Sequence, residues 1–227
     1  LRSTDDFDQA MELYKKIIAR DSQQYTAHKG MGEIYVALAK KLPKEAEGAR
    51  GELARRALEA LEHSVAANPF DAEVYLAQGD AYRCWCSPDR LEQMRFAQQA
   101  AKLPPKYDRR CLGMTEAERK ALDGYTPDSV VRLRMHDSGS TTFTDPIRGT
   151  LAFENGLLDD RVLLKSDGFP TYNLAVVVDD HLMRITHVVR GEEWLPSTPA
   201  HLRVYEALRW DPPLIAHTPL LLNADRG

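Results

Sequence analysis

The sequence predicts two parts of different fold class: an all-α segment over residues 1–82 and an α/β portion over residues 83–227. Three observations support this division. Up to about residue 82, apolar residues recur at the spacing of amphipathic helices. Short segments with alternating apolar and polar residues follow, which is typical of strands. Two apolar runs near the C-terminus then end in polar clusters, and this predicts charged side chains at the carboxyl ends of core strands.

Residues 5–82 contain several predicted helices. Two sets of residues share one spacing: His28, Gly32, Tyr35 and Tyr75, Gly79, Tyr82. Small residues let paired helices approach closely, and aromatic residues fill the space beside them. The pattern resembles the tetratricopeptide repeat, with about two and a half units and a Lys-, Glu- and Ala-rich helical extension from Ala37 to Glu52. A plain array of helical hairpins is the alternative.

Composition indicates a folded soluble protein, with 43% hydrophobic and 28% charged residues. The formal net charge of −4 excludes a global basic field but not local basic surfaces. No apolar run approaches the ~20 residues of a membrane span, and no signal peptide opens the chain. Three cysteines, an odd number, favour a reducing, cytoplasmic location over a disulfide framework. Because the chain begins with Leu1 and stops at Gly227 in a turn-like segment, we expect a fragment or a fusion.

Residues 83–168 predict an α+β region. A helix is expected over residues 88–102, with Ser87 as its N-cap. Thr115 and Glu118 have the spacing of a capping box at the start of a second, short helix. Short strands are predicted over residues 130–135, 141–143, 150–153 and 161–164, separated by turn residues.

The C-terminal residues 169–227 carry the most informative pattern. A strand is predicted at Leu174–Val178, ending in Asp179, Asp180 and His181, which we interpret as sheet-bracing groups. A second strand, Ile185–Val189, runs into a polar cluster, and a helix capped by Ser197 or Thr198 follows. The ends of two neighbouring strands would present Tyr172 and Arg190 to one common hollow.

The order and spacing of residues 167–199 resemble glutamyl-tRNA synthetase, a class I aminoacyl-tRNA synthetase. Residues from about Ala77 onward resemble the part of this family that enters its acceptor-stem-binding insertion, so the seam with the helical segment is expected between residues 70 and 83. The resemblance implies that residues 83–168 form the insertion and that residues 169–227 begin the second half of the nucleotide-binding catalytic domain. It also implies the parent reaction, ATP-dependent ligation of glutamate to its tRNA through a glutamyl-adenylate.

The resemblance assigns roles to individual residues. Arg190 binds a carboxylate of glutamate, for which its planar fork of donors is suited, and Tyr172 offers a hydroxyl to the same ligand. Asn173 is placed with these substrate contacts. Glu193 and Trp194 occupy positions that line the adenosine pocket of the ATP substrate. The sequence departs from some family members next to these residues, where valine replaces an asparagine at position 176.

Basic residues in the insertion are candidates for contact with the tRNA acceptor end. They are Arg132, Arg134, Arg148 and Lys165. A solvated sheet face explains the same pattern about equally well.

Three cysteines and a tyrosine form a candidate structural zinc site. Cys84, Cys86, Tyr107 and Cys111 have the order of a zinc-binding set found in some bacterial glutamyl-tRNA synthetases and in their glutamyl-queuosine paralogues. Thiolates and one oxygen are suitable ligands for tetrahedral zinc. The alternative is reduced, packed thiols, as in zinc-free members, and glycine at position 113 replaces the histidine of some relatives.

Two signature motifs of class I synthetases are absent from the sequence. Neither a His-Ile-Gly-His-type motif nor a Lys-Met-Ser-Lys-Ser-type loop occurs, and the nearest candidate, His28-Lys29-Gly30, lies among the repeat-like helices. Because these motifs handle the ATP phosphates, we expect this chain alone not to aminoacylate tRNA. Two alternatives remain open. One is the glutamyl-queuosine tRNA-modifying paralogue, and the other is a non-catalytic module whose helices bind a partner protein.

Overall fold

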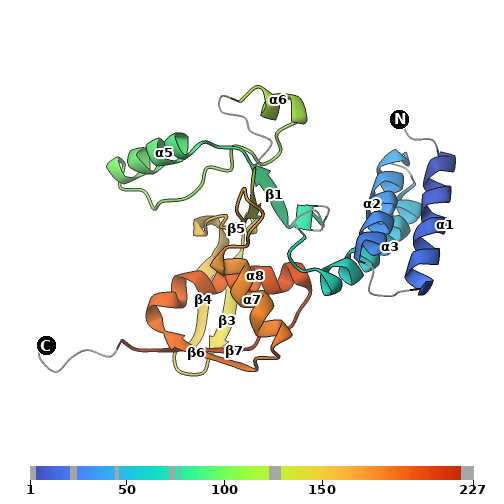
Figure 1. The fold of residues 1–227 in the computed structure, drawn as a ribbon. Helices are drawn as coiled ribbons and strands as arrows, with labels where there is room; N and C mark the ends of the chain where they lie inside the picture. Colours follow the sequence, from blue (N-terminus) through green and yellow to red (C-terminus); the bar gives the residue numbers. More distant parts are fainter. Residues whose placement is uncertain are drawn as a thin grey trace, which may run out of the picture. The chain divides into compact units, whose positions relative to one another are not determined.

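The computed structural model describes residues 4–20, 25–43, 46–71, 75–76, 78–122 and 129–220. The chain divides into two compact units, Leu1–Gly79 and Asp80–Gly227, each built around its own contacts. Figure 1 shows both units. Within the described ranges, no helix has the length and apolar character needed to cross a membrane.

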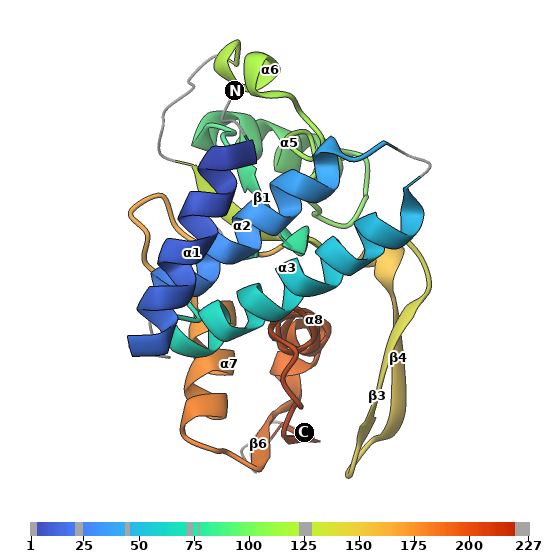
Figure 2. The same cartoon turned by 90° about the vertical axis from the view of Figure 1, so that its right-hand side faces the viewer.

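The first unit contains the helices α1 (Thr4–Arg20), α2 (Tyr25–Lys41) and α3 (Glu47–Ala67). In Figure 2, α2 lies between α1 and α3, and it packs against both. Two glycines of α2 make this approach possible. A Cβ atom on Gly32 would lie 2.7 Å from Leu61 Cγ of α3, and one on Gly30 would lie 2.4 Å from the Tyr14 ring of α1. The predicted use of a small residue at a helix contact is therefore confirmed for Gly32, and Gly30 makes a second contact of this kind.

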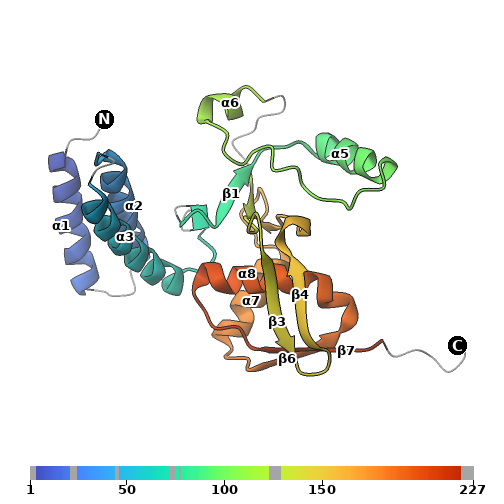
Figure 3. The same ribbon diagram turned by 180° about the vertical axis from the view of Figure 1, so that it is seen from behind.

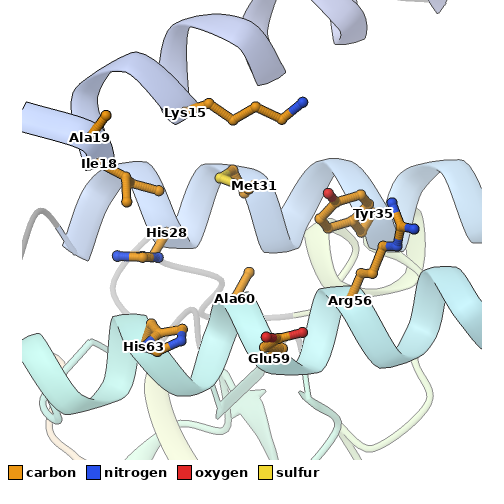
Figure 4. Close-up of a pocket in the computed structure, with 10 residues that line it drawn as sticks. All are labelled: Lys15, Ile18, Ala19, His28, Met31, Tyr35, Arg56, Glu59, Ala60 and His63. Atoms are coloured by element: carbon orange, nitrogen blue, oxygen red, sulfur yellow. The ribbon is translucent and has the colours of Figure 1, made fainter. Parts of the chain in front are cut away.

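A hollow of about 390 Å³ lies among these helices. Figure 4 shows its lining, with Ile18, Met31 and Ala60 forming an apolar part. Lys15 and Arg56 also line it, from α1 and α3. At another part of the lining, the rings of His28 and His63 lie 5.1 Å apart. The lining also includes the acidic Glu59, while Lys15 pairs with Glu12 and Arg56 with Glu52. The helical unit therefore offers a concave surface that combines apolar and charged side chains.

The predicted helical repeat fails at its last half unit. Tyr82 was expected to continue a helix in register with Tyr75, but it lies in strand β1 (Ala81–Cys84) of the second unit. Gly79, which has a φ of +80°, precedes this change of structure. The predicted extension between Ala37 and Glu52 is divided between the end of α2 and the start of α3, while residues 44–45 lie outside the described part.

The second unit combines three small sheets with helices (Figures 1 and 3). Its remaining elements, in chain order, are α5 (Pro88–Ala100), α6 (Glu116–Lys120), β2 (Val130–Leu133), β3 (Ser140–Asp145), β4 (Gly149–Glu154), η1 (Asn155–Leu157), β5 (Val162–Leu164), α7 (Tyr172–Leu182), β6 (His187–Gly191), η2 (Glu192–Ser197), α8 (Thr198–Leu208) and β7 (Leu214–Thr218). Strands β1, β2 and β5 form an antiparallel sheet, and β3 pairs with β4 as a hairpin. Strands β6 and β7 are parallel, and β3 also packs against β7.

Local sequence signals correctly predict the starts of helices α5 and α6. The Ser87 hydroxyl accepts a hydrogen bond from Arg90 N and caps α5. At α6, Thr115 and Glu118 form the predicted capping box. Ser197 occupies the N-cap position of α8 without a side-chain cap hydrogen bond, and the Thr198 hydroxyl is used elsewhere.

The predicted strand at Leu174–Val178 is wrong, because these residues lie in helix α7. An apolar run of this length does not distinguish a strand from a buried helix segment. The buried side chains are Leu174, Val177 and Val178, which follow the i, i+3, i+4 spacing of a helix that packs against α8 and β5. Asp179, Asp180 and His181 therefore lie in the last turns of α7 and not at a strand end.

The buried residue Asp160 accepts hydrogen bonds from four segments of the second unit. Asp160 is fully buried, and its side chain accepts hydrogen bonds from Tyr82 Oη (2.6 Å), Arg109 Nη2 (2.8 Å) and Met135 N (2.9 Å). Its carbonyl accepts another from Arg132 Nη1 over 2.9 Å. These groups come from β1, the loop after α5, β2 and the residues just beyond β2. Because buried charges require such partners, Asp160 is a main structural support of the second unit.

Candidate functional site

Arg190 lies near the carboxyl end of β6, paired in register with His217 of the parallel strand β7. Its guanidinium donates from Nε to His217 Nε2 (3.0 Å), from Nη1 to His201 Nδ1 (3.2 Å) and from Nη2 to Thr198 Oγ1 (2.6 Å). Because a guanidinium only donates, both imidazoles accept through unprotonated nitrogens. The side chain of Arg190 is therefore fixed by three neighbours that carry no negative charge.

The charge of Arg190 lacks a carboxylate partner at ion-pair distance within the described residues. Burial lowers the pKa of Arg190, whereas Tyr172 and Asp180 raise it from a greater distance. A guanidinium nevertheless stays protonated in proteins. Burial also raises the pKa of Asp180. A half-buried cation with unused N–H donors is suited to binding an anionic ligand.

Tyr172 and Asn173 begin α7 and approach the same neighbours as Arg190. The Tyr172 ring, half of which is exposed, lies 6.0 Å from the His201 ring and 5.0 Å from the Trp194 ring. Asn173 Oδ1 lies 3.3 Å from His201 Nε2. The structure thus brings Arg190, Tyr172 and Asn173 around His201, although Tyr172 is presented by a helix start and not by a strand.

His201 is buried in α8 and remains neutral at physiological pH. Burial is the main cause that lowers the pKa of His201 to about 4, and the charges of Arg190 and Arg161 act in the same direction. Since Nδ1 accepts from Arg190, Nε2 carries the proton and donates to Asn173 Oδ1. His201 therefore links Arg190 to the start of α7 without adding a second positive charge.

Glu193 and Trp194 lie in η2, which follows β6 directly. Trp194 is about one-third exposed and contacts the Tyr172 ring, so its indole forms part of the same surface. Glu193 is exposed, and its carboxylate lies over the backbone of Gly191.

Cys84, Cys86 and Cys111 come together in the second unit, with sulfur atoms within 4.8 Å of one another. The Tyr107 hydroxyl lies 3.4 Å from Cys84 Sγ and 3.3 Å from Cys86 Sγ, and Cys86 Sγ lies 3.7 Å from Cys111 Sγ. Two guanidinium groups lie beside this cluster: Arg90 donates to Cys86 Sγ over 3.4 Å, and Arg132 covers the Tyr107 ring at 4.1 Å. The four predicted ligands are therefore adjacent in space.

Comparison with known proteins decides the family of the second unit. A family profile described as "tRNA synthetases class I (E and Q), catalytic domain" matches residues 70–227, which is more than half of the chain. The chain belongs to the class I glutamyl- and glutaminyl-tRNA synthetase family. We refer to Asp80–Gly227 below as the synthetase unit.

Individual relatives agree with this assignment. The chain is 56% identical over 152 residues to a glutamate–tRNA ligase of Acidothermus cellulolyticus, covering 67% of this chain and 30% of the relative. It is 54% identical over 150 residues to a glutamate–tRNA ligase of Gloeobacter violaceus, covering 65% of this chain and 28% of the relative. The crystal structure of a glutamate tRNA ligase from Elizabethkingia meningosepticum in complex with its amino acid matches with a TM-score of 0.60 and 38% identity, over 67% of this chain and 32% of that one. The chain thus spans about a third of the length of these relatives.

The basic candidates for tRNA contact occupy different environments in the synthetase unit. Arg132 is almost fully buried, at 5% exposure, so the prediction that it meets acceptor-end phosphates does not fit the structure. Arg134 is exposed and ion-paired with Asp137 at 3.3 Å. Arg148, in the β3–β4 turn, donates to His217 O and pairs with Glu192. Lys165 is exposed, 3.5 Å from Asp167. The alternating pattern predicted that Arg132 and Arg134 share one exposed surface. In the structure, Arg132 is buried and only Arg134 is exposed.

Four residues around Arg190 escaped sequence-based prediction as site residues: Asp145, Thr198, His201 and His217. Thr198 and His201 are three residues apart in the helix after η2, a spacing that places both on one helical face. That spacing was an available signal once the helix had been predicted. Asp145 and His217 carry no such signal, since 72 residues separate them in the sequence.

Proposed function

We propose that the synthetase unit binds the glutamate substrate of an ATP-dependent glutamate–tRNA ligase, with Arg190 receiving a carboxylate. The observation that carries this proposal is the fixed, half-buried guanidinium of Arg190, which has unused donors and no carboxylate partner in the described structure. The phenol of Tyr172 and the amide of Asn173 border the same place and supply polar contacts. The parent reaction is activation of glutamate by ATP and transfer of the glutamyl group to the acceptor end of its tRNA.

Two further parts of this proposal concern ATP and tRNA. Trp194 offers a flat apolar face for adenine beside Tyr172, and Glu193 is exposed next to it. Arg134 and Lys165 remain candidates for phosphate contacts, because both are exposed. Arg148 is instead engaged with Glu192 and His217, so a tRNA contact there requires it to leave Glu192.

Titration of the full chain with L-glutamate tests this function. We expect saturable changes in the NMR signals of the Trp194 indole and the Arg190 Nε–H group, and weaker changes with L-glutamine, which lacks one carboxylate. Pyrophosphate exchange by the chain alone is expected to stay at background, because the sequence contains neither class I signature motif. Unchanged Arg190 and Trp194 signals at saturating L-glutamate would refute the proposed binding site.

We also propose that Cys84, Cys86, Tyr107 and Cys111 hold a structural zinc ion in the insertion. Tetrahedral zinc with Zn–S bonds of about 2.3 Å requires sulfur–sulfur separations of about 3.8 Å, and Cys86 and Cys111 lie 3.7 Å apart. Arg90 and Arg132 supply positive charge beside a set of thiolates whose total charge exceeds that of the metal. Zinc bound here fastens β1 to the loop after α5 and takes no part in the ligation chemistry.

Replacing Cys111 with serine should remove zinc from the protein. The wild-type chain, purified from zinc-supplemented medium, is expected to carry about one equivalent of zinc, and Cys111→Ser much less, with a lower melting temperature. Elemental analysis and thermal unfolding measure both quantities. Tyr82→Phe is the matched control, because this neighbouring buried hydroxyl bonds to Asp160 and not to a sulfur atom. Equal zinc content in wild type and Cys111→Ser would contradict the site.

A second proposed function, peptide binding, concerns the helical unit and rests on the hollow in Figure 4. Its volume of about 390 Å³ falls within the range of ligand pockets, about 300–1,000 Å³. The partner that fits is a peptide with an apolar side chain for the space between Met31 and Ala60. An acidic residue beside that side chain would lie near Lys15 and Arg56.

Labelled peptides test this binding on the full chain. A peptide with leucine flanked by glutamates is expected to bind, and its counterpart with lysines is not. Arg56→Glu should abolish binding by reversing a charge of the lining. Arg55→Glu is the control, since Arg55 pairs with the same Glu52 but does not line the hollow. Equal affinity for both peptides, or equal effects of both variants, would disprove the proposal.

A further inference from the structure

We propose that Asp145 and His217 act as a positioning pair that orients the Arg190 guanidinium toward the carboxylate of the substrate. Neither residue is placed where it would touch that ligand, because both are fully or almost fully buried, at 1% and 0% exposure. The pair acts through hydrogen bonds that run from Asp145 to His217 and on to Arg190. The inference rests on the proposed glutamate-binding role of Arg190.

The hydrogen bonds of His217 determine where its ring carries a proton. Nε2 accepts from Arg190 Nε over 3.0 Å, because the guanidinium has no acceptor. Nδ1 lies 2.8 Å from Asp145 Oδ2 and therefore donates to the carboxylate. The neutral tautomer with hydrogen on Nδ1 satisfies both bonds. Thr198 Oγ1 also lies 3.1 Å from Nε2 and can donate its hydroxyl hydrogen there. The opposite tautomer would direct an N–H group at the N–H group of Arg190 and would set two acceptors, Nδ1 and the Asp145 carboxylate, against each other.

Asp145 is fixed as an ionised acceptor by the end of its own hairpin. It is the last residue of β3, and its Oδ1 accepts from Ile147 N (2.8 Å) and Arg148 N (3.1 Å). Its Oδ2 accepts from His217 N (2.9 Å) as well as from the ring. Burial alone would raise the pKa of Asp145, but these hydrogen bonds outweigh it and lower the pKa. The carboxylate therefore offers only acceptors to His217, which selects the Nδ1–H tautomer.

The result of this chain of bonds is a defined set of free donors on Arg190. A guanidinium has five N–H groups, and three of them are used by His217, His201 and Thr198. One N–H remains on each terminal nitrogen. Two such donors match the two oxygens of a carboxylate. Rotation of the fork, once Nε loses its acceptor, would misdirect both of them.

The substitution Asp145→Asn tests the pair with almost no change in size. The asparagine side chain has two orientations. In one, its NH2 group faces His217 Nδ1, which forces the opposite tautomer of His217. In the other, its NH2 group faces the N–H groups of Ile147 and Arg148, so that donors face donors. Mutation of the residues that hydrogen-bond to metal ligands costs about 10–100-fold in affinity or activity, and by analogy we expect a loss of this size for L-glutamate. Asp167→Asn is the matched control, because Asp167 also accepts from the backbone two residues on, at Phe169, but is exposed. It should change the affinity less than about twofold.

NMR of isotope-labelled histidine and arginine measures the His217 tautomer and the Arg190 Nε–H signal. A general loss of stability would not change the tautomer, so this measurement distinguishes positioning from a purely structural role. In the wild type, His217 should show the Nδ1–H tautomer. Asp145→Asn should convert it to Nε2–H and shift the Arg190 Nε–H signal, because the amide orientation that keeps the wild-type tautomer sets a donor against two backbone N–H groups. If Asp145→Asn does not fold, His217→Phe and His217→Gln give the same test. Glutamine can restore an acceptor near the Nε2 position, so it should retain more affinity than phenylalanine, which has none.

The outcomes separate the inference from the proposed function. A wild-type chain that binds no L-glutamate refutes the proposed function. In that case the His217 tautomer and the Arg190 Nε–H signal still show whether Asp145 and His217 orient the Arg190 guanidinium. An Nε2–H tautomer in the wild type overturns the inference. So do an Arg190 signal that Asp145→Asn leaves unchanged and equal affinities of His217→Gln and His217→Phe.

Discussion

Replacing Arg190 with leucine should weaken L-glutamate binding by about 30-fold or more. Removal of one partner from a hydrogen-bonded charge pair costs about 2–5 kcal/mol, and 1.4 kcal/mol corresponds to a factor of ten in affinity. Arg190→Lys should give an intermediate loss, because it keeps the charge but not the planar fork of donors. Isothermal titration of the full chain measures each dissociation constant.

Arg95→Leu is the control for Arg190→Leu. Arg95 is an exposed arginine of α5, so its loss should not change the affinity for L-glutamate. The melting temperature of each variant is measured together with its affinity, because Arg190→Leu also removes hydrogen bonds to His217, His201 and Thr198 and can lower stability. Equal affinity in Arg190→Leu and wild type would remove Arg190 from the proposed site.

Replacing Asp160 with alanine should produce the largest loss of stability in the synthetase unit. The substitution removes the acceptor of the Tyr82 hydroxyl, the Met135 amide and the Arg109 guanidinium in a fully buried place. Breaking a buried ion pair from one side costs about 3–5 kcal/mol. Denaturant unfolding followed by circular dichroism measures this difference in the free energy of unfolding.

Asp137→Ala provides an internal comparison for Asp160→Ala. Asp137 also pairs with Arg109, but its side chain is 63% exposed. Exposed ion pairs contribute about 0–1 kcal/mol, so this variant should unfold almost like the wild type. Similar losses in the free energy of unfolding in both variants would show that the contribution of Asp160 to stability does not depend on its burial.

The elements with local signals were predictable from the sequence, and those that depend on tertiary packing were not. Ser87 and the Thr115–Glu118 pair act within one helical turn, so their spacing alone identifies the caps. The apolar run from Leu174 to Val178 has high strand propensity, yet packing against α8 and β5 makes it a helix. The strand conformation of Tyr82 was equally unpredictable from local sequence, because Tyr82 pairs with Arg132, 50 residues later in the chain.

The candidate site shows the same division. The resemblance to a synthetase family pointed to Tyr172 and Arg190, and the structure brings both against His201. Arg132 was misassigned because alternation along a strand does not reveal that the Asp160 carbonyl and the Tyr107 ring cover its guanidinium. The supporting pair of Asp145 and His217 depends on the hairpin packing against β7, and no sequence spacing encodes that contact.

A crystal structure of the full chain with L-glutamate would show whether Arg190 binds the substrate. We predict one ligand carboxylate within about 2.7–2.9 Å of the terminal nitrogens of Arg190, the usual length of charge-assisted hydrogen bonds. The Tyr172 hydroxyl should lie within hydrogen-bonding reach of the same ligand. Glutamate bound away from Arg190, or no bound glutamate at saturating concentration, would contradict the account.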